Sequence, residues 1–269
     1  MSPVAERDTD AGQARALPLP IWRRAWEQFG TLLVAILIAL SIRACVIEPY
    51  RIPSGSMLPT LLIGDHLFVN KFIYGVKGPF TDVRLPGWRE PQRGDVVVFD
   101  VARDPHGGIY PADQRPELPS DRFVKRIVAL PGDTVELRGS ALWINGEQVP
   151  VEVTQETFED EMGRPLRLAF EQLDGLPHRI LDDPSRTGPE RPPVTLPPGR
   201  YFVMGDNRDH SNDSRYWGTV RLVEMKGPAF LLYWSWDWNG PWTDLLNPLH
   251  WWDLLTDKMR WDRIGEGIR

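Results

Sequence analysis

Cysteine is almost absent from this 269-residue chain, and the residue spacings that hold metal ions are missing as well. The single cysteine, Cys45, cannot form a disulfide within the chain and cannot supply a cysteine-based zinc site. The five histidines are scattered, and none of them stands in an HExxH pattern. We therefore expect a fold without internal disulfides and without a metal or other cofactor.

Clusters of positive charge are also missing. The chain has 31 Lys and Arg against 37 Asp and Glu, which gives a formal net charge of -6 at pH 7. Proteins that bind nucleic acid neutralise its phosphates with clustered Lys and Arg side chains. The composition therefore argues against nucleic acid as a partner.

Long apolar runs are scarce, with one exception near the N-terminus. Residues 29–42 read FGTLLVAILIALSI and carry no charge, and apolar residues resume after Arg43. The run is shorter than the about 20 residues of a full membrane span. However, Trp22 and Trp26 can lie at the membrane interface, and Arg43 can extend its guanidinium to the headgroups. The pattern predicts a single transmembrane anchor over residues 21–47, after a disordered segment 1–20.

The alternative for this run is a cleaved signal peptide, because Ala39-Leu40-Ser41 resembles a cleavage site. For the anchor, the excess of positive charge before the run places the N-terminus in the cytoplasm and residues 48–269 outside the membrane. The arginines concerned are Arg15, Arg23 and Arg24 before the run and Arg51 after it. We expect a single-pass protein of the cytoplasmic (inner) membrane.

Tryptophan is concentrated at the C-terminal end. Seven of the 12 tryptophans fall within the last 36 residues. Indoles of this kind pack in a protein core, and they are also enriched in the headgroup layer of a membrane. The sequence leaves both interpretations open. These tryptophans are Trp234, Trp236, Trp238, Trp242, Trp251, Trp252 and Trp261.

After residue 48 the pattern is typical of a mostly β protein. Short segments rich in β-branched and aromatic residues are bounded by Gly, Pro and Asp, and Asn145-Gly146 predicts a tight hairpin. The predicted strand segments are 66–74, 95–101, 122–130, 133–137, 141–144, 148–151, 200–204 and 218–234. Residues 77–92 suit an exposed loop, and the acidic, then proline-rich stretch 152–198 is predicted to be an insertion. We expect a partly open, barrel-like β core with a smaller inserted lobe.

The segment Ile52-Pro53-Ser54-Gly55-Ser56-Met57-Leu58-Pro59 is the first candidate for chemistry. Two prolines restrict the backbone on either side, and Gly55 permits a tight turn that would present the Ser56 hydroxyl rigidly. An ordinary Ser/Gly/Pro loop has the same composition. A serine becomes a nucleophile only beside a base, so the interpretation depends on finding that base.

Two side chains are candidates for the base. His210 lies between Asp209 and Ser211, which leaves a Ser-His-Asp triad open. In the strand segment Asp121–Val128, alternation places Lys125 on the same face as Phe123 and Ile127. Apolar neighbours disfavour the ammonium form, which is the condition that a lysine base requires. A solvated Lys-Arg pair at a strand edge is the alternative.

The third candidate segment is Met204–Gly218, which is rich in carboxylates. A calcium loop that starts at Asp206 or at Asp209 would lack both the turn glycine and the closing glutamate. Calcium is therefore excluded, and a charged turn held by pairs such as Asp213 with Arg215 remains.

Together these segments resemble bacterial type I signal peptidases (leader peptidases). The blocks that carry the resemblance are SGSMLPTL around Ser56, RGDVVVF at 93–99, RFVKRIVALPGD at 122–133 and GDNRDHSNDSRYWG at 205–218, directly after an apolar anchor. The blocks and the anchor cover about 200 residues in the family's order. The familiar members carry two membrane segments, whereas this chain has one predicted anchor.

The resemblance implies a serine endopeptidase that removes signal peptides from exported preproteins after Ala-x-Ala. It makes Ser56 the nucleophile and Lys125 the general base, with the Ser54 hydroxyl and the Ser56 N–H as the oxyanion hole. Ser211 would orient the lysine, and Asp213 and Arg215 would form a structural ion pair near the site. The positions that line the shallow pockets for small residues correspond to Tyr50, Ile52, Met57, Leu61 and Val124.

The spacing between anchor and nucleophile agrees with this substrate. Nine residues from Ile47 to Ser56 extend over at most about 30 Å, so the nucleophile would be held near the membrane surface. A repressor-type Ser-Lys protease would need a DNA-binding domain in place of the anchor. The alternative from another class is a catalytically silent, membrane-tethered β-domain that binds exported proteins.

Overall fold

The computed structural model describes residues 26, 29–38, 46–75, 86–237 and 254–268. Two compact units divide the chain, one comprising Met1–Ile42 and the other Arg43–Arg269. In the first unit, residues 29–38 are helical. Within the described ranges, no helix combines the length and the apolar character that crossing a bilayer requires. Most of the predicted anchor 21–47 and all of segment 1–20 lie outside the described residues.

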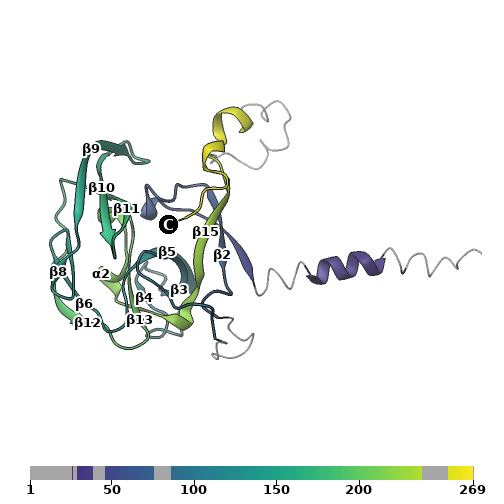
Figure 1. Ribbon diagram of the computed structural model, residues 1–269, viewed down its shortest axis with the longest axis horizontal. Helices are drawn as coiled ribbons and strands as arrows, with labels where there is room; N and C mark the ends of the chain where they lie inside the picture. The colour runs from purple at the N-terminus through teal and green to yellow at the C-terminus, as the bar shows by residue number, and fades with distance from the viewer. Residues whose placement is uncertain (1–25, 27–28, 39–45, 76–85, 238–253, 269) are drawn as a thin grey trace, which may run out of the picture. The chain divides into compact units, whose positions relative to one another are not determined.

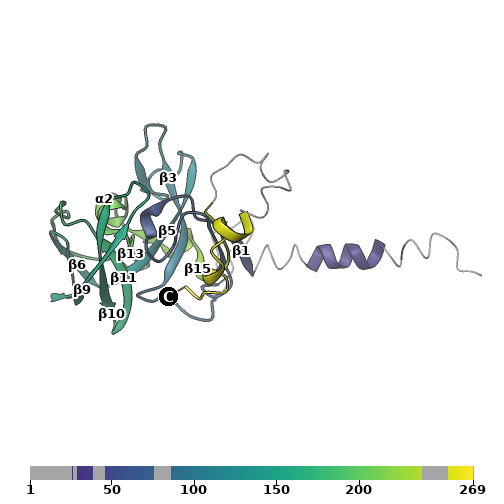
Figure 2. The same ribbon diagram turned by 90° about the horizontal axis from the view of Figure 1, so that it is seen from above.

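The second unit is built from β-strands, which confirms the prediction of a mostly β protein. The strands that are described form three sheets and do not close into a barrel. In Figures 1 and 2 the two smaller sheets lie on one side of this unit, and strands β2 and β15 lie on the other.

The largest sheet has eight strands in the order β1-β2-β15-β3-β5-β13-β14, with β4 paired to β3. All the strand pairs that are described in it are antiparallel. Its strands are β1 (Ile47–Arg51), β2 (Asp65–Asn70), β3 (Val96–Arg103), β4 (Ile109–Pro111), β5 (Ser120–Ala129), β13 (Arg200–Met204), β14 (Val220–Arg221) and β15 (Met225–Ser235).

The predicted insertion 152–198 contributes to both smaller sheets. Its first part forms a three-stranded sheet of β9 (Val151–Glu159), β10 (Pro165–Leu173) and β11 (Leu176–Asp182). Its last strand, β12, joins the four-stranded sheet of β6 (Thr134–Arg138), β7 (Ala141–Ile144), β8 (Glu147–Gln148) and β12 (Arg191–Thr195). The predicted Asn-Gly turn connects β7 and β8, and Asn145 (φ 54) and Gly146 (φ 83) both have the positive φ that such a turn needs.

Helical segments in the second unit are short. They are η1 (Gly55–Met57), η2 (Arg208–His210), α2 (Ser214–Trp217), η3 (Leu222–Glu224), η6 (Leu254–Lys258) and η7 (Trp261–Arg263). Two of them, η1 and η2, lie on the candidate segments around Ser56 and His210, and η1 and η2 are in contact.

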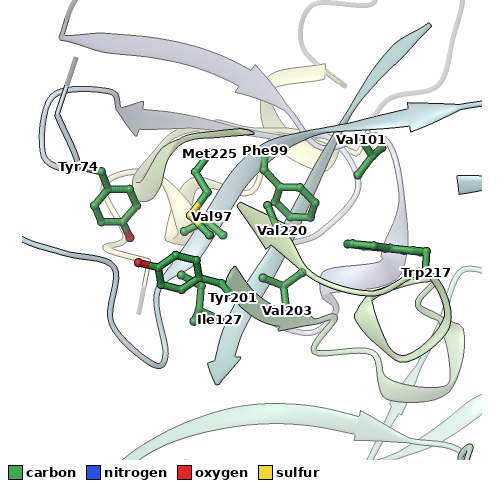
Figure 3. Close-up of a cluster of buried hydrophobic side chains, with 10 residues drawn as sticks. All are labelled: Tyr74, Val97, Phe99, Val101, Ile127, Tyr201, Val203, Trp217, Val220 and Met225. Atoms are coloured by element: carbon green, nitrogen blue, oxygen red, sulfur yellow. The ribbon is translucent and has the colours of Figure 1, made fainter. Parts of the chain in front are cut away.

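The core forms on both faces of the central strands. Figure 3 shows one cluster, in which Phe99 of β3, Val203 of β13 and Trp217 of α2 pack together. The aromatic rings of Phe99 and Trp217 are tilted against each other. A second cluster joins β5 and β13 to the four-stranded sheet. A third lies beneath the Ser56 segment and contains Ile52, Met57 and Leu61. Strand β5 contributes to the core from its second half, which is buried from the candidate Lys125 to Ala129.

The structure describes three of the seven C-terminal tryptophans. Trp234 and Trp236 are half-buried with their ring centroids 6.0 Å apart, and Trp261 is exposed. The other four lie outside the described residues. The core and membrane interpretations of this region therefore both stay open.

Candidate active site

The nucleophile candidate lies on a short loop that follows β1. Ile52 and Met57 are buried on either side of the loop and anchor it in the third cluster, while Ser56 is half-buried in the single turn of η1. The loop backbone is also held from outside. Asn207 donates its backbone N–H to the Ser56 carbonyl (3.2 Å) and its side-chain amide to the Gly55 carbonyl (3.1 Å). The tight turn that the prolines and Gly55 predicted is therefore fixed at both carbonyls next to the serine.

Lys125 reaches this serine from the middle of β5. Its Nζ donates a hydrogen bond to the Ser56 Oγ at 2.5 Å, although the two residues are 69 positions apart in the sequence. The lysine is only 3% exposed. Its Nζ lies 5.5 Å from the centroid of the Phe123 ring, the same-face neighbour that strand alternation predicted. The solvated edge pair is therefore wrong for Lys125.

The burial of Lys125 changes its acid–base behaviour. Desolvation disfavours the ammonium and lowers the pKa of Lys125 to about 8, while Asp213 and Asp206 oppose the shift and Arg215 adds to it. At pH 8 about half of the Lys125 side chains are then neutral. A neutral amine within hydrogen-bond distance of a serine hydroxyl can accept its proton.

Asp213 organises the loop that lies beside this pair. It is fully buried and accepts hydrogen bonds from the Gly205 N–H (2.9 Å), the Ser211 hydroxyl (2.7 Å) and the Arg215 Nε (2.8 Å). Burial alone would raise the pKa of Asp213. The charge of Arg215 and these hydrogen bonds outweigh burial and lower the pKa below its ordinary value. Asp213 and Arg215 therefore form the predicted ion pair close to the lysine.

Ser211 lies next to the nucleophile loop without a hydrogen bond to the lysine among the described contacts. Its hydroxyl donates to Asp213 instead. A Cβ placed on Gly205 would lie 2.3 Å from the Ser211 Oγ and 2.5 Å from the Ser56 carbonyl oxygen. Ser211 and Ser56 thus approach the same glycine, and the lysine-orienting role of Ser211 stays a prediction.

The sequence reasoning did not identify a second buried ion pair. Arg126, on the opposite face of β5 from Lys125, makes two hydrogen bonds to Asp206, at 2.8 Å and 2.7 Å, and both side chains are about 1% exposed. Thr60 also donates to Asp206 (2.6 Å). Strand alternation places Arg126 on the face opposite Lys125. Its partner Asp206, however, is 80 residues away in the sequence, so only the tertiary structure reveals the pair.

A cavity of about 570 Å³ opens over the Ser56–Lys125 pair. Ser54 is exposed at its edge, and the apolar side chains that line it include Tyr50, Ile52, Met57, Val98 and Val124. Four of these five are predicted pocket residues. The fifth predicted residue, Leu61, is fully buried in the cluster beneath the loop and is not among the lining residues.

His210 is not placed to activate Ser56. Its Nδ1 lies 3.3 Å from the Asn207 Oδ1 and its Nε2 lies 3.8 Å from Asp183. Burial lowers the pKa of His210. Among the described residues, the base in hydrogen-bond contact with the Ser56 hydroxyl is Lys125 and not the histidine.

Comparison with known proteins identifies the family of this chain. Residues 25–234 match the family described as signal peptidase, peptidase S26. The chain is 39% identical over 214 residues to signal peptidase I of Pseudomonas aeruginosa, covering 75% of this chain and 69% of that protein. It is 31% identical over 244 residues to signal peptidase I of Aquifex aeolicus, covering 78% and 84%. A crystal structure of a signal peptidase I from Enterococcus faecalis V583 aligns with 28% identity and a TM-score of 0.28, covering 52% of this chain and 97% of that chain.

The family match shows that the chain is a peptidase of a serine peptidase family. It belongs to the signal peptidase family, peptidase S26. The predicted family is thereby confirmed, and the assignment follows from the family match and the relatives in sequence.

The lowered pKa of Lys125 predicts a pH dependence of stability. Between pH 8 and 10.5 the unfolded chain keeps the Lys125 proton while the folded protein loses it, so stability should rise with pH. A shift from 10.5 to about 8 corresponds to about 3 kcal/mol. We expect Lys125→Met, which removes the buried ammonium, to be more stable than wild type at pH 7, and the difference to shrink by pH 10.5.

Urea unfolding of both proteins from pH 6 to 10.5 measures this difference. Because other groups titrate equally in the two proteins, the difference isolates Lys125. A constant difference across this range would show that the pKa of Lys125 is not lowered by folding.

Proposed function

We propose that the protein is a membrane-anchored serine endopeptidase with a Ser-Lys dyad, which removes signal peptides from exported preproteins after small residues of the Ala-x-Ala type. The observation that carries the proposal is the 2.5 Å hydrogen bond between the buried Lys125 Nζ and the Ser56 Oγ. A neutral lysine with a pKa of about 8 is a suitable base for this serine at neutral to mildly alkaline pH.

The proposed reaction uses the dyad twice. Neutral Lys125 takes the Ser56 proton as the Oγ attacks the scissile carbonyl, and it then gives that proton to the leaving amine. The Ser54 hydroxyl and the Ser56 backbone N–H would donate to the oxyanion. Water, activated by Lys125 in the same way, would hydrolyse the acyl-enzyme and regenerate Ser56.

The surroundings of the dyad support the proposed substrate. The apolar side chains of Tyr50, Ile52, Met57 and Val124 in the larger cavity suit the small apolar residues that precede the cleavage site. The relatives are named signal peptidase I, which acts on signal peptides. In this proposal residues 21–47 anchor the chain in the inner membrane, the lipid bilayer and the preprotein are its partners, and the catalytic unit faces the extracytoplasmic side.

A catalytically silent, membrane-tethered binding domain is the second candidate. A buried lysine lowers the stability of the fold at pH values where it is protonated. A binding domain would carry this cost without using the amine beside the serine hydroxyl. The intact Ser56–Lys125 pair therefore favours the enzyme.

Substitution of the dyad tests the mechanism. Ser56→Ala and Lys125→Ala should each abolish cleavage of an Ala-x-Ala peptide, and the double variant should be no worse than either single one because the pair acts as a unit. His210→Ala should retain far more activity than either dyad variant, since among the described residues His210 has no hydrogen bond to Ser56. Circular dichroism of each variant controls for folding. Substantial activity in Lys125→Ala, together with an inactive His210→Ala, would assign the base to histidine.

The pH profile distinguishes the two bases without any substitution. Because Lys125 must lose its proton to act, kcat/KM should rise with pH through about 8, the pKa of the lysine in the free enzyme. A histidine base would give a limb near 6.5. Initial rates on a synthetic Ala-x-Ala peptide from pH 5 to 10 measure the profile. A limb centred near 6.5 would contradict the lysine mechanism.

The oxyanion role of Ser54 predicts a specific kinetic effect. Ser54→Ala should lower kcat by roughly 10²–10³ with little change in KM, because the hydroxyl would act mainly in the transition state. Steady-state kinetics on the same peptide separates the two constants. A change confined to KM would mean that Ser54 binds the ground-state substrate instead.

A further inference from the structure

A second cavity borders the nucleophile loop. It has a volume of about 170 Å³ and shares Ser54 and Ser56 with the larger cavity. The rest of its lining is different: instead of Tyr50, Met57 and Val124 it has Asn207, His210 and the turn that joins β9 to β10. Ser56 is therefore shared by two cavities whose other lining residues differ.

The turn between β9 and β10, Asp160–Arg164, has a fixed shape. The Asp160 carboxylate accepts hydrogen bonds from the backbone N–H groups of Met162 and Arg164, both at 2.9 Å. The Arg164 Nε donates to the same carboxylate at 2.7 Å. The charges of Asp160 and Arg164 are thereby paired with each other within the turn.

Glu161 is part of this turn, and its carboxylate lies next to the nucleophile loop. A Cβ placed on Gly55 would lie 2.7 Å from the Glu161 Oε1, so the carboxylate rests against the residue next to Ser56. Among the described residues it has no hydrogen-bonded or ion-paired partner, and burial, together with Asp160 and Asp237, raises its pKa. Glu161 thus presents an uncompensated carboxylate at the edge of the smaller cavity.

The charge of this cavity is negative. Asp160 and Glu161 contribute two negative charges and Arg164 one positive charge, which leaves one net negative charge. His210 does not alter this balance at pH 8, because burial lowers its pKa. A cationic group would be attracted here and an anionic group repelled.

We propose that this cavity receives the first residues of the mature protein, on the far side of the cleaved bond, and that Glu161 selects for positive charge among them. The inference rests on the proposed peptidase function. A polypeptide bound across Ser56 must continue in both directions, and the larger cavity accounts for only one of them. The smaller cavity shares the nucleophile with the larger one, so it is available to the residues on the other side of the cleaved bond.

Three synthetic peptides test the proposal. They share one Ala-x-Ala signal sequence and differ only in the first two mature residues, which are Lys-Lys, Gln-Gln or Glu-Glu. For wild type at pH 8 and low salt, we expect kcat/KM to be about fivefold higher for Lys-Lys than for Gln-Gln, in the upper range for an exposed ion pair, and lowest for Glu-Glu. Glu161→Gln should bring the Lys-Lys to Gln-Gln ratio close to one, and Glu161→Lys should reverse the preference.

Glu152→Gln is the matched control. Glu152 is exposed on the same hairpin, and eight residues of extended strand place it roughly 25 Å from the turn. This variant has the same net charge as Glu161→Gln and should keep the wild-type ratios. A second measurement needs no variant: 1 M salt should reduce the wild-type preference, because it screens exposed charges.

Each outcome distinguishes this inference from the function on which it rests. Wild type that cleaves all three peptides at equal rates, or a Glu161→Gln variant that keeps the wild-type ratio, would overturn the role of Glu161 and leave the peptidase intact. Wild type that cleaves none of the three peptides would overturn the proposed function itself. A ratio that falls equally in Glu161→Gln and Glu152→Gln would mean that overall charge, and not this cavity, sets the preference.

Discussion

The structure depends on keeping one amine out of water. The Lys125 amine lies in a site where two carboxylates, Asp206 and Asp213, both favour its charged form. Each carboxylate has its own arginine: Arg126 pairs with Asp206, and Arg215 pairs with Asp213. Because these negative charges are largely compensated, burial remains the largest influence and the pKa of Lys125 falls. The two ion pairs thus support the chemistry without touching the serine.

The small sheet of β9, β10 and β11 also contacts the segment that holds the site. The buried Glu171 of β10 forms a two-point ion pair with Arg208, and the Leu181 N–H of β11 donates to the Asp206 carbonyl (2.8 Å). Between Asp206 and Arg208 lies Asn207, which holds the carbonyls of Gly55 and Ser56. The insertion is therefore linked to the nucleophile loop through this short segment of backbone, in addition to the direct approach of Glu161 to Gly55.

Local patterns predicted the parts of this protein that depend on neighbours in sequence. Alternation placed Lys125 on the same face of its strand as Phe123, and Asn145-Gly146 predicted a hairpin, because strand and turn geometry are set within a few residues. The pairing of Arg126 with Asp206 and of Glu171 with Arg208 could not be predicted this way, since each partner is fixed only by the folded sheets. The position of β12 was missed for the same reason: its proline-rich sequence indicates a loop, but its pairing with β6 makes it an edge strand.

The different responses of these groups to acid have a consequence for the resting protein. The ion pairs lower the pKa values of Asp206 and Asp213 below their ordinary acidic values, whereas Lys125 takes up its proton already near pH 8. As the pH falls, the Lys125 amine is therefore protonated well before the carboxylates of the two ion pairs are. If Lys125 is the base, as proposed, the protein would stay folded but inactive over that interval, and raising the pH again would restore the neutral amine without refolding.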